Sequence, residues 1–91
     1  ALDLRRGKMY ATEMTQGVLI RADLGGSNLE TLVTGLGLPF GLALDVARSK
    51  MYWTEAYTEG PLRRANLDGS NVETLIQSSW MVLQFPTLAA R

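Results

Sequence analysis

The chain has 91 residues, of which 46% are hydrophobic and 20% charged, and its nine basic and nine acidic residues leave no formal net charge. This length allows one domain with a modest core. Balanced charge argues against general attraction to nucleic acid or to an anionic membrane surface. There is no cysteine and no histidine, which removes disulfides, thiolate metal sites and the commonest general base. No apolar run reaches the roughly 18 residues of a membrane-spanning helix, so no membrane insertion is expected.

One pattern occurs twice along the chain. Residues 8–33 read KMYATEMTQGVLIRADLGGSNLETLV, and residues 50–76 read KMYWTEAYTEGPLRRANLDGSNVETLI. The opening tripeptide Ala-Leu-Asp also recurs, at residues 43–45. The repeat is about 42 residues long, which lies in the range of four-stranded propeller blades.

The repeated segments predict short strands joined by turns. In chain order, the expected strands are residues 1–3, 8–12, 18–24, 29–33, 41–45, 50–54, 62–67 and 72–76. Asp68-Gly69 between two strands indicates a hairpin, since both residue types tolerate positive φ. Glycines interrupt every window with helical spacing. We therefore predict an all-β chain made of two four-stranded antiparallel blades of a β-propeller.

The repeat also predicts how the chain is divided. Residues 1–41 form the first blade, whose first strand is truncated at the N-terminus, and residues 42–80 form the second. Residues 81–91 form a strand-like tail that resembles the first strand of a next blade. Two blades alone leave open sheet edges. Two remedies stay open: three copies associate head to tail into a ring, or the blades belong to a longer repeat chain.

Tyr52-Trp53-Thr54-Glu55, together with residues 39–51 and 62–76 around it, resembles the YWTD repeat, the class B repeat of the low-density lipoprotein receptor family. The resemblance implies a six-bladed propeller that serves as a non-enzymatic binding platform with an extracellular location. Two positions of the motif differ from the family pattern in this chain. Glutamate replaces the motif's aspartate at Glu13 and Glu55, and Ala11 replaces its tryptophan in the first copy.

Four charged residues recur at equivalent repeat positions, namely Glu13, Glu55, Arg21 and Arg64. Equivalent residues of neighbouring blades lie well apart, which disfavours a carboxylate pair for acid–base chemistry. We expect these four residues to tie blades together, because half-buried charges are usually paired. The glycine-rich segment 35–41 lacks the ending of a phosphate loop. No catalytic residue, metal or cofactor is expected.

Ligand contact should come from residues that do not repeat. In an up-and-down blade, the loop between the second and third strands and the connection to the next blade lie on one edge. We expect this edge to carry Met14, Thr15, Gln16, Leu36, Tyr57, Thr58, Glu59 and Trp80, of which Tyr57, Glu59 and Trp80 are the predicted partner contacts. The predicted function is binding of a protein or glycan. The alternative is a purely structural repeat that self-assembles without a ligand.

Overall fold

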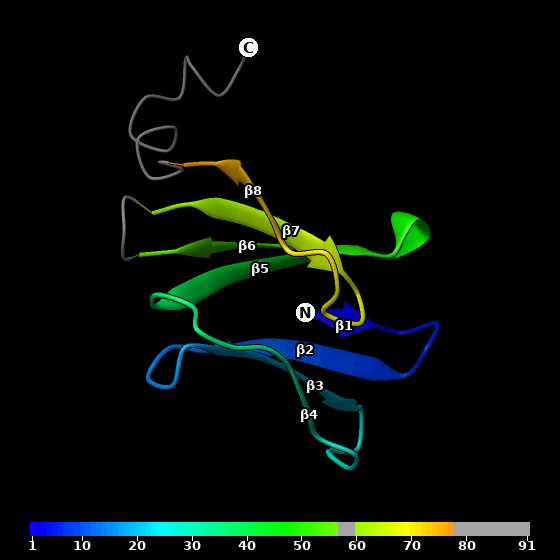
Figure 1. Ribbon diagram of the computed structural model, residues 1–91. Helices are drawn as coiled ribbons and strands as arrows, with labels where there is room; N and C mark the ends of the chain where they lie inside the picture. Colours follow the sequence, from blue (N-terminus) through cyan, green and yellow to red (C-terminus); the bar gives the residue numbers. More distant parts are fainter. Residues whose placement is uncertain (57–59, 78–91) are drawn as a thin grey trace.

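The computed structural model describes residues 1–56 and 60–77, which form two four-stranded antiparallel sheets (Figure 1). This confirms the all-β prediction of two propeller-type blades. The first sheet contains β1 (Leu2–Asp3), β2 (Lys8–Glu13), β3 (Val18–Asp23) and β4 (Glu30–Val33). The second contains β5 (Pro39–Asp45), β6 (Lys50–Glu55), β7 (Leu62–Asn66) and β8 (Glu73–Ile76), with a short 3-10 turn, η1 (Val46–Arg48), between β5 and β6.

Each strand pairs with its neighbour in the chain, so both sheets are simple meanders. The registers repeat as well: Met9 is opposite Ala22 in the first sheet, and Met51 is opposite Ala65 in the second. In both sheets the pairing between the third and fourth strands has a register shift near the start of the third strand, between Leu19 and Ile20 in the first sheet and between Leu62 and Arg63 in the second. The two copies of the sequence therefore encode the same strand pairing.

Turn chemistry explains why the strands end where they do. The turn after the third strand has the same backbone in both sheets, with positive φ at Gly26 and Asn28 and again at Gly69 and Asn71. Glycine adopts such angles without strain, and asparagine is the side chain that tolerates them best. The polar glycine turns therefore fix the third and fourth strands of each blade as a hairpin.

The second sheet begins with Pro39, inside the range 1–41 that the sequence assigns to the first blade. The two residues before the expected strand thus already belong to β5, and Pro39 lies opposite Glu55. The expected tail, residues 81–91, lies outside the described residues.

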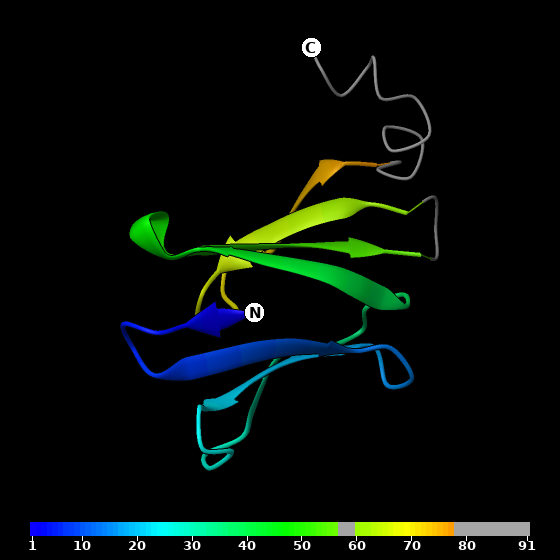
Figure 2. The same cartoon turned by 180° about the vertical axis from the view of Figure 1, so that it is seen from behind.

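The two sheets stack face to face, as both views show (Figures 1 and 2). The first sheet contributes Tyr10, Leu19 and Val33 to the core between them, the second contributes Met51, Trp53, Ala65 and Leu67, and the connection between the sheets contributes Leu36. Met51 and Trp53 are equivalent to Met9 and Ala11, which alternate with Tyr10 along β2 and therefore point to the opposite face. The sheets thus pack by opposite faces of the same repeat, in a head-to-tail stack.

Polar contacts accompany this packing. The Arg21 guanidinium donates to the Leu67 carbonyl at 3.3 Å, and the Thr12 hydroxyl donates to the Phe40 carbonyl at 3.2 Å. The turn at Gly69 lies against β4, where a Cβ atom on this glycine would be 2.6 Å from the Leu32 carbonyl oxygen. The hydrogen bonds of Arg21 and Thr12 and the close fit of the Gly69 turn together fix the distance between the two sheets.

Candidate binding surfaces

The edge that carries the β2–β3 loop and the start of β5, here called the loop edge, exposes two large apolar side chains. Met14 is 46% exposed and Phe40 is 50% exposed. The hydrogen bond between Thr12 and Phe40 brings the end of β2 beside the start of β5. Phe40 was not among the predicted contacts, although its position between Pro39 and Gly41 at a strand start is a signal of an edge residue.

Leu36, which was expected on this edge, lies beside the β2–β3 loop but is buried. Leu36 is only 7% exposed and belongs to the core. Its backbone N–H donates to the Gly17 carbonyl at 2.9 Å, which draws the connection inward against the β2–β3 loop. A Cβ atom on Gly17 would be 2.2 Å from the Leu36 carbonyl oxygen, so only glycine fits there. The predicted contacts Tyr57, Glu59 and Trp80 lie outside the described residues.

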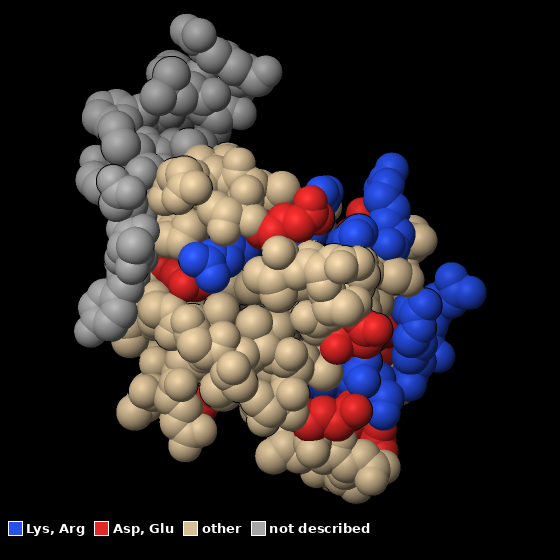
Figure 3. Space-filling model, viewed as in Figure 1, with Lys and Arg blue, Asp and Glu red and all other residues tan. Residues whose placement is uncertain are grey.

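Charge is distributed unevenly between the two edges. Figure 3 shows most of the visible Lys, Arg, Asp and Glu side chains on the side that carries the β1–β2 turn and η1. On the charged side, Arg6 pairs with Asp3 and Arg48 pairs with Asp45, each at 3.0 Å. Burial raises the pKa of Asp3, but the hydrogen bonds and charge of Arg6 outweigh it, so the net pKa is lowered.

Glu55 is a buried carboxylate, 4% exposed, at the end of β6. One oxygen accepts from the Gly37 backbone N–H at 2.9 Å, and the other accepts from the Trp53 indole at 3.0 Å. The Arg63 guanidinium forms an ion pair with it at 3.3 Å. The carboxylate therefore joins β6 and β7 to the connection between the sheets. Arg63 was missed because its equivalent in the first copy is Ile20, so it does not recur.

Glu13 occupies the equivalent position in the first sheet but has different contacts. It is partly exposed, and its carboxylate accepts from the Gln16 backbone N–H at 2.6 Å within the β2–β3 loop. The residues equivalent to Trp53 and Arg63 are Ala11 and Ile20, which offer no donor to a carboxylate. The two recurring glutamates therefore have different local roles.

Arg21 and Arg64 each pair with the fourth strand of their own sheet. Arg21 contacts Glu30 at 2.8 Å, and Arg64 contacts Glu73 at 3.1 Å. Arg21 also reaches the second sheet through Leu67, and its guanidinium lies 6.0 Å from the centre of the Tyr10 ring. The Glu30 carboxylate, and next the Tyr10 hydroxyl, raise the pKa of Arg21, so its charge is retained at the sheet interface.

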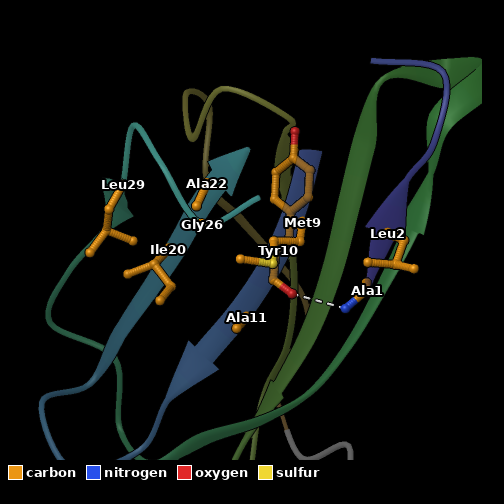
Figure 4. Close-up of a pocket in the computed structure, with 9 residues that line it drawn as sticks. All are labelled: Ala1, Leu2, Met9, Tyr10, Ala11, Ile20, Ala22, Gly26 and Leu29. Atoms are coloured by element: carbon orange, nitrogen blue, oxygen red, sulfur yellow. Dashed lines mark hydrogen bonds between the residues drawn. The ribbon is translucent and has the colours of Figure 1, made fainter. Parts of the chain in front are cut away.

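The face of the first sheet that points away from the second, here called face 1, contains an apolar hollow of about 290 Å³. It is lined by Ala1, Leu2, Met9, Tyr10, Ala11, Ile20, Ala22, Gly26 and Leu29 (Figure 4). The N-terminal amine donates to the Tyr10 carbonyl at 2.9 Å along one side. Because the lining is almost entirely apolar, the hollow suits a hydrophobic side chain.

The outer face of the second sheet, here called face 2, is also apolar. Leu75 and Ile76 on β8 are 41% and 37% exposed. Tyr52 and Leu62 are half-buried on the neighbouring strands and share this face, because they alternate with Met51 and Arg63, which point toward the first sheet. Each sheet thus buries one face against the other, and among residues 1–56 and 60–77 no further sheet covers its second face.

Across residues 1–56 and 60–77, no group of three acidic side chains is placed to hold a metal ion. Within the same ranges, no helix has the length and apolar character needed to cross a membrane.

Comparison with known proteins supports the fold and leaves the function open. No protein-family model matches the chain, and no curated protein matches it. Among solved structures, a chain in the crystal structure of a nidogen/laminin complex matches with a TM-score of 0.78 and 23% identity, over 84% of this chain and 30% of that one. This chain therefore spans about a third of the matched chain, which is a β-propeller of the YWTD kind. The two sheets are accordingly two blades of a YWTD-like β-propeller fold.

Proposed function

We propose that the chain is a non-enzymatic binding module that presents its loop edge to a partner protein. The observation that carries the proposal is the pair of exposed apolar side chains, Met14 and Phe40, on the loop edge. Exposed aromatic and Met side chains are enriched where proteins bind one another. The matched solved structure is a complex of two proteins, nidogen and laminin, which is consistent with a protein partner.

Tyr57, Glu59 and Trp80 complete the proposed surface. The first two belong to the segment between Glu55, where β6 ends, and Leu62, where β7 begins. β6 runs parallel to β2 in the stacked repeat, so the loop after β6 leaves from the same edge as the loop after β2. The sequence thus adds an aromatic and an acidic residue to an edge that already exposes Met14 and Phe40.

The recurring charged residues support binding over catalysis. In the described part of the chain, Arg21, Arg64 and Glu55 engage partners that hold strands together. We propose that Arg21 and Glu55 tie the blades, since one reaches the opposite sheet and the other reaches the connection between sheets. Glu13 and Arg64 would take the same part where a further blade packs on this pair.

Binding can be tested with immobilised laminin, other matrix proteins and a glycan array as probes. Phe40→Ser and Met14→Ser should each weaken binding about tenfold or more, as truncation of an interface anchor does. Tyr57→Ala and Trp80→Ala test the predicted contacts in the same assay. Leu4→Ser is the matched control, because Leu4 is 73% exposed in the β1–β2 turn on the opposite edge.

The outcomes distinguish a protein partner, a glycan ligand and the absence of a binding function at the loop edge. Loss of binding in the Phe40 and Met14 variants with an unchanged Leu4 variant supports the proposal. Binding of glycans alone would assign the edge to glycan recognition and overturn the protein partner. Failure to bind any probe, or equal losses in all variants, would overturn the loop-edge function.

A further inference from the structure

We infer that face 1 of one chain binds face 2 of a second copy, so that the chain associates with itself head to tail. This inference is independent of the proposed function, because it uses the sheet faces and leaves the loop edge free. Its basis is the interface that the chain already forms between its own two sheets. In that interface, the repeat positions that form face 1 in the first sheet pack, in the second sheet, against the positions that form face 2.

Face 1 has the same repeat positions as the face that the second sheet buries. Met9 is equivalent to Met51, and Leu24 is equivalent to Leu67. Met51 is 0% exposed and Leu67 is 6% exposed, whereas Leu24 is 45% exposed and Met9 is half-buried. The difference arises because, in the part of the chain that the structure describes, a sheet covers one of these faces and no sheet covers the other.

Face 2 has the same positions as the face that the first sheet buries. Ile76 is equivalent to Val33, and Tyr52 is equivalent to Tyr10. Val33 and Tyr10 are 8% and 2% exposed, whereas Ile76 is 37% exposed and Tyr52 is half-buried. Face 2 therefore carries the tyrosine and branched aliphatic side chains that already pack against a face like face 1.

The polar contacts of the internal interface also have equivalents. Arg21 donates to the Leu67 carbonyl across the two sheets. In the proposed contact, Arg64 of one copy would meet the Leu24 carbonyl of the other. The turn at Gly69 fits closely against Leu32, and its equivalent, Gly26, has nothing within 4 Å of a Cβ position. Gly26 would meet the backbone around Leu75 of the second copy.

The hollow on face 1 marks where the two interfaces differ. Ala11 stands where the second sheet has Trp53, and this loss of volume accompanies the cavity of about 290 Å³. On face 2, Ile76 replaces the smaller Val33. A larger side chain on the incoming face therefore meets a face that has room for it.

The expected assembly is a closed ring of three chains. The two blades match 30% of the β-propeller chain in the nidogen/laminin complex, so about three such pairs fill its length. A heterologous contact that closes produces a ring, in which each copy uses both faces. The whole chain should then behave as a species three times the 10.0 kDa of one copy.

Sedimentation of the 91-residue chain over a range of concentrations tests the contact. Ile20→Glu breaks face 1 and Ile76→Glu breaks face 2, because each places a charge in an apolar interface. Each variant alone should weaken association at least about tenfold and sediment as a single chain. Mixed in equal amounts, they should form pairs that grow no further, because one intact face remains on each. Leu4→Glu, outside both faces, should leave the assembly unchanged.

Circular dichroism shows whether each variant is folded. Leu2→Glu and Leu75→Glu serve as second variants on the two faces, since these side chains are 59% and 41% exposed and are not needed for the internal core. A single chain at every concentration overturns the inference. Sensitivity to only one face, or a mixture that does not pair, also overturns it, because the contact would then not be head to tail.

Discussion

The two sheets have the same strands and turns, but the equivalent glutamates Glu55 and Glu13 differ in burial and in hydrogen bonding. Glu55 in the second sheet is 4% exposed and bonds to Trp53 and Gly37. Glu13 in the first sheet is partly exposed and bonds only within its own loop, at Gln16, among the contacts that the structure describes. The backbone repeats faithfully, whereas the environment of the motif carboxylate does not.

The repeated sequence determines the strands of each blade, whereas the residues around each glutamate determine whether that glutamate is buried. The Trp53 indole donates a hydrogen bond to Glu55, and Arg63 forms an ion pair with it at 3.3 Å. Ala11 and Ile20 provide neither contact, and face 1 is open. A buried carboxylate is stable only when it is fully paired, so burial of Glu55 requires these particular neighbours as well as the motif.

The largest expected effect is that of removing Glu55. Glu55→Ala leaves the Trp53 indole and the Arg63 guanidinium without their carboxylate in a buried site. We expect the free energy of unfolding to fall by about 2–4 kcal/mol, since Arg63 retains some access to water. Glu13→Ala should cost about 0.5–1 kcal/mol, the value of one partly exposed hydrogen bond. Urea denaturation of both variants measures the difference, and equal losses would show that the two carboxylates are equivalent.

A smaller effect is expected at the equivalent turn glycines. Gly69 and Gly26 have φ values of 90° and 94°, so alanine strains both turns to a similar extent. Only at Gly69 would the new Cβ approach the Leu32 carbonyl, at 2.6 Å. Gly69→Ala should therefore cost about 1–2 kcal/mol more than Gly26→Ala. Thermal or urea unfolding provides the comparison, and matching values for the two variants would mean that the turn does not fix the spacing of the sheets.

The smallest effect concerns acid. The hydrogen bond from Lys8, followed by that from Asn28, lowers the pKa of Asp23 below its ordinary value of 3.8. A lowered carboxylate pKa stabilises the fold above that value, and the contribution is lost as pH falls through the depressed pKa. The second sheet has Asn66 at this position, whose side-chain oxygen accepts from Lys50 at 2.6 Å without titrating.

Asp23→Asn should therefore make the free energy of unfolding less dependent on pH below 3.8 and lower it slightly at pH 7, where the Asp23 carboxylate contributes. Asn66→Asp should have the opposite effect and add acid sensitivity to the second sheet. Urea unfolding at a series of pH values measures both slopes. Unchanged slopes in both variants would show that this ion pair does not contribute to folding.

Much of the fold could be predicted because its signals are local. The expected strand at residues 50–54 is β6, one residue longer at its end, and the turn at Asp68-Gly69 forms the expected hairpin. The candidate binding residues were harder to find. Leu36 was expected on the loop edge because it lies in a connection, but a hydrogen bond to Gly17 places it in the core. Phe40 and Arg63 were missed because neither is marked by repetition.

The sequence by itself determined the repeat length, the strands and the turns, because strand alternation and positive-φ residues act within a few positions along the chain. It did not determine which face of each blade is covered. Both faces of β2 are apolar, with Met9 and Ala11 on one side and Tyr10 on the other, so alternation alone cannot choose between them. Tertiary structure made that choice, because the connection through Leu36 stacks opposite faces of the repeat. This stacking buries Glu55 and leaves Glu13 partly exposed.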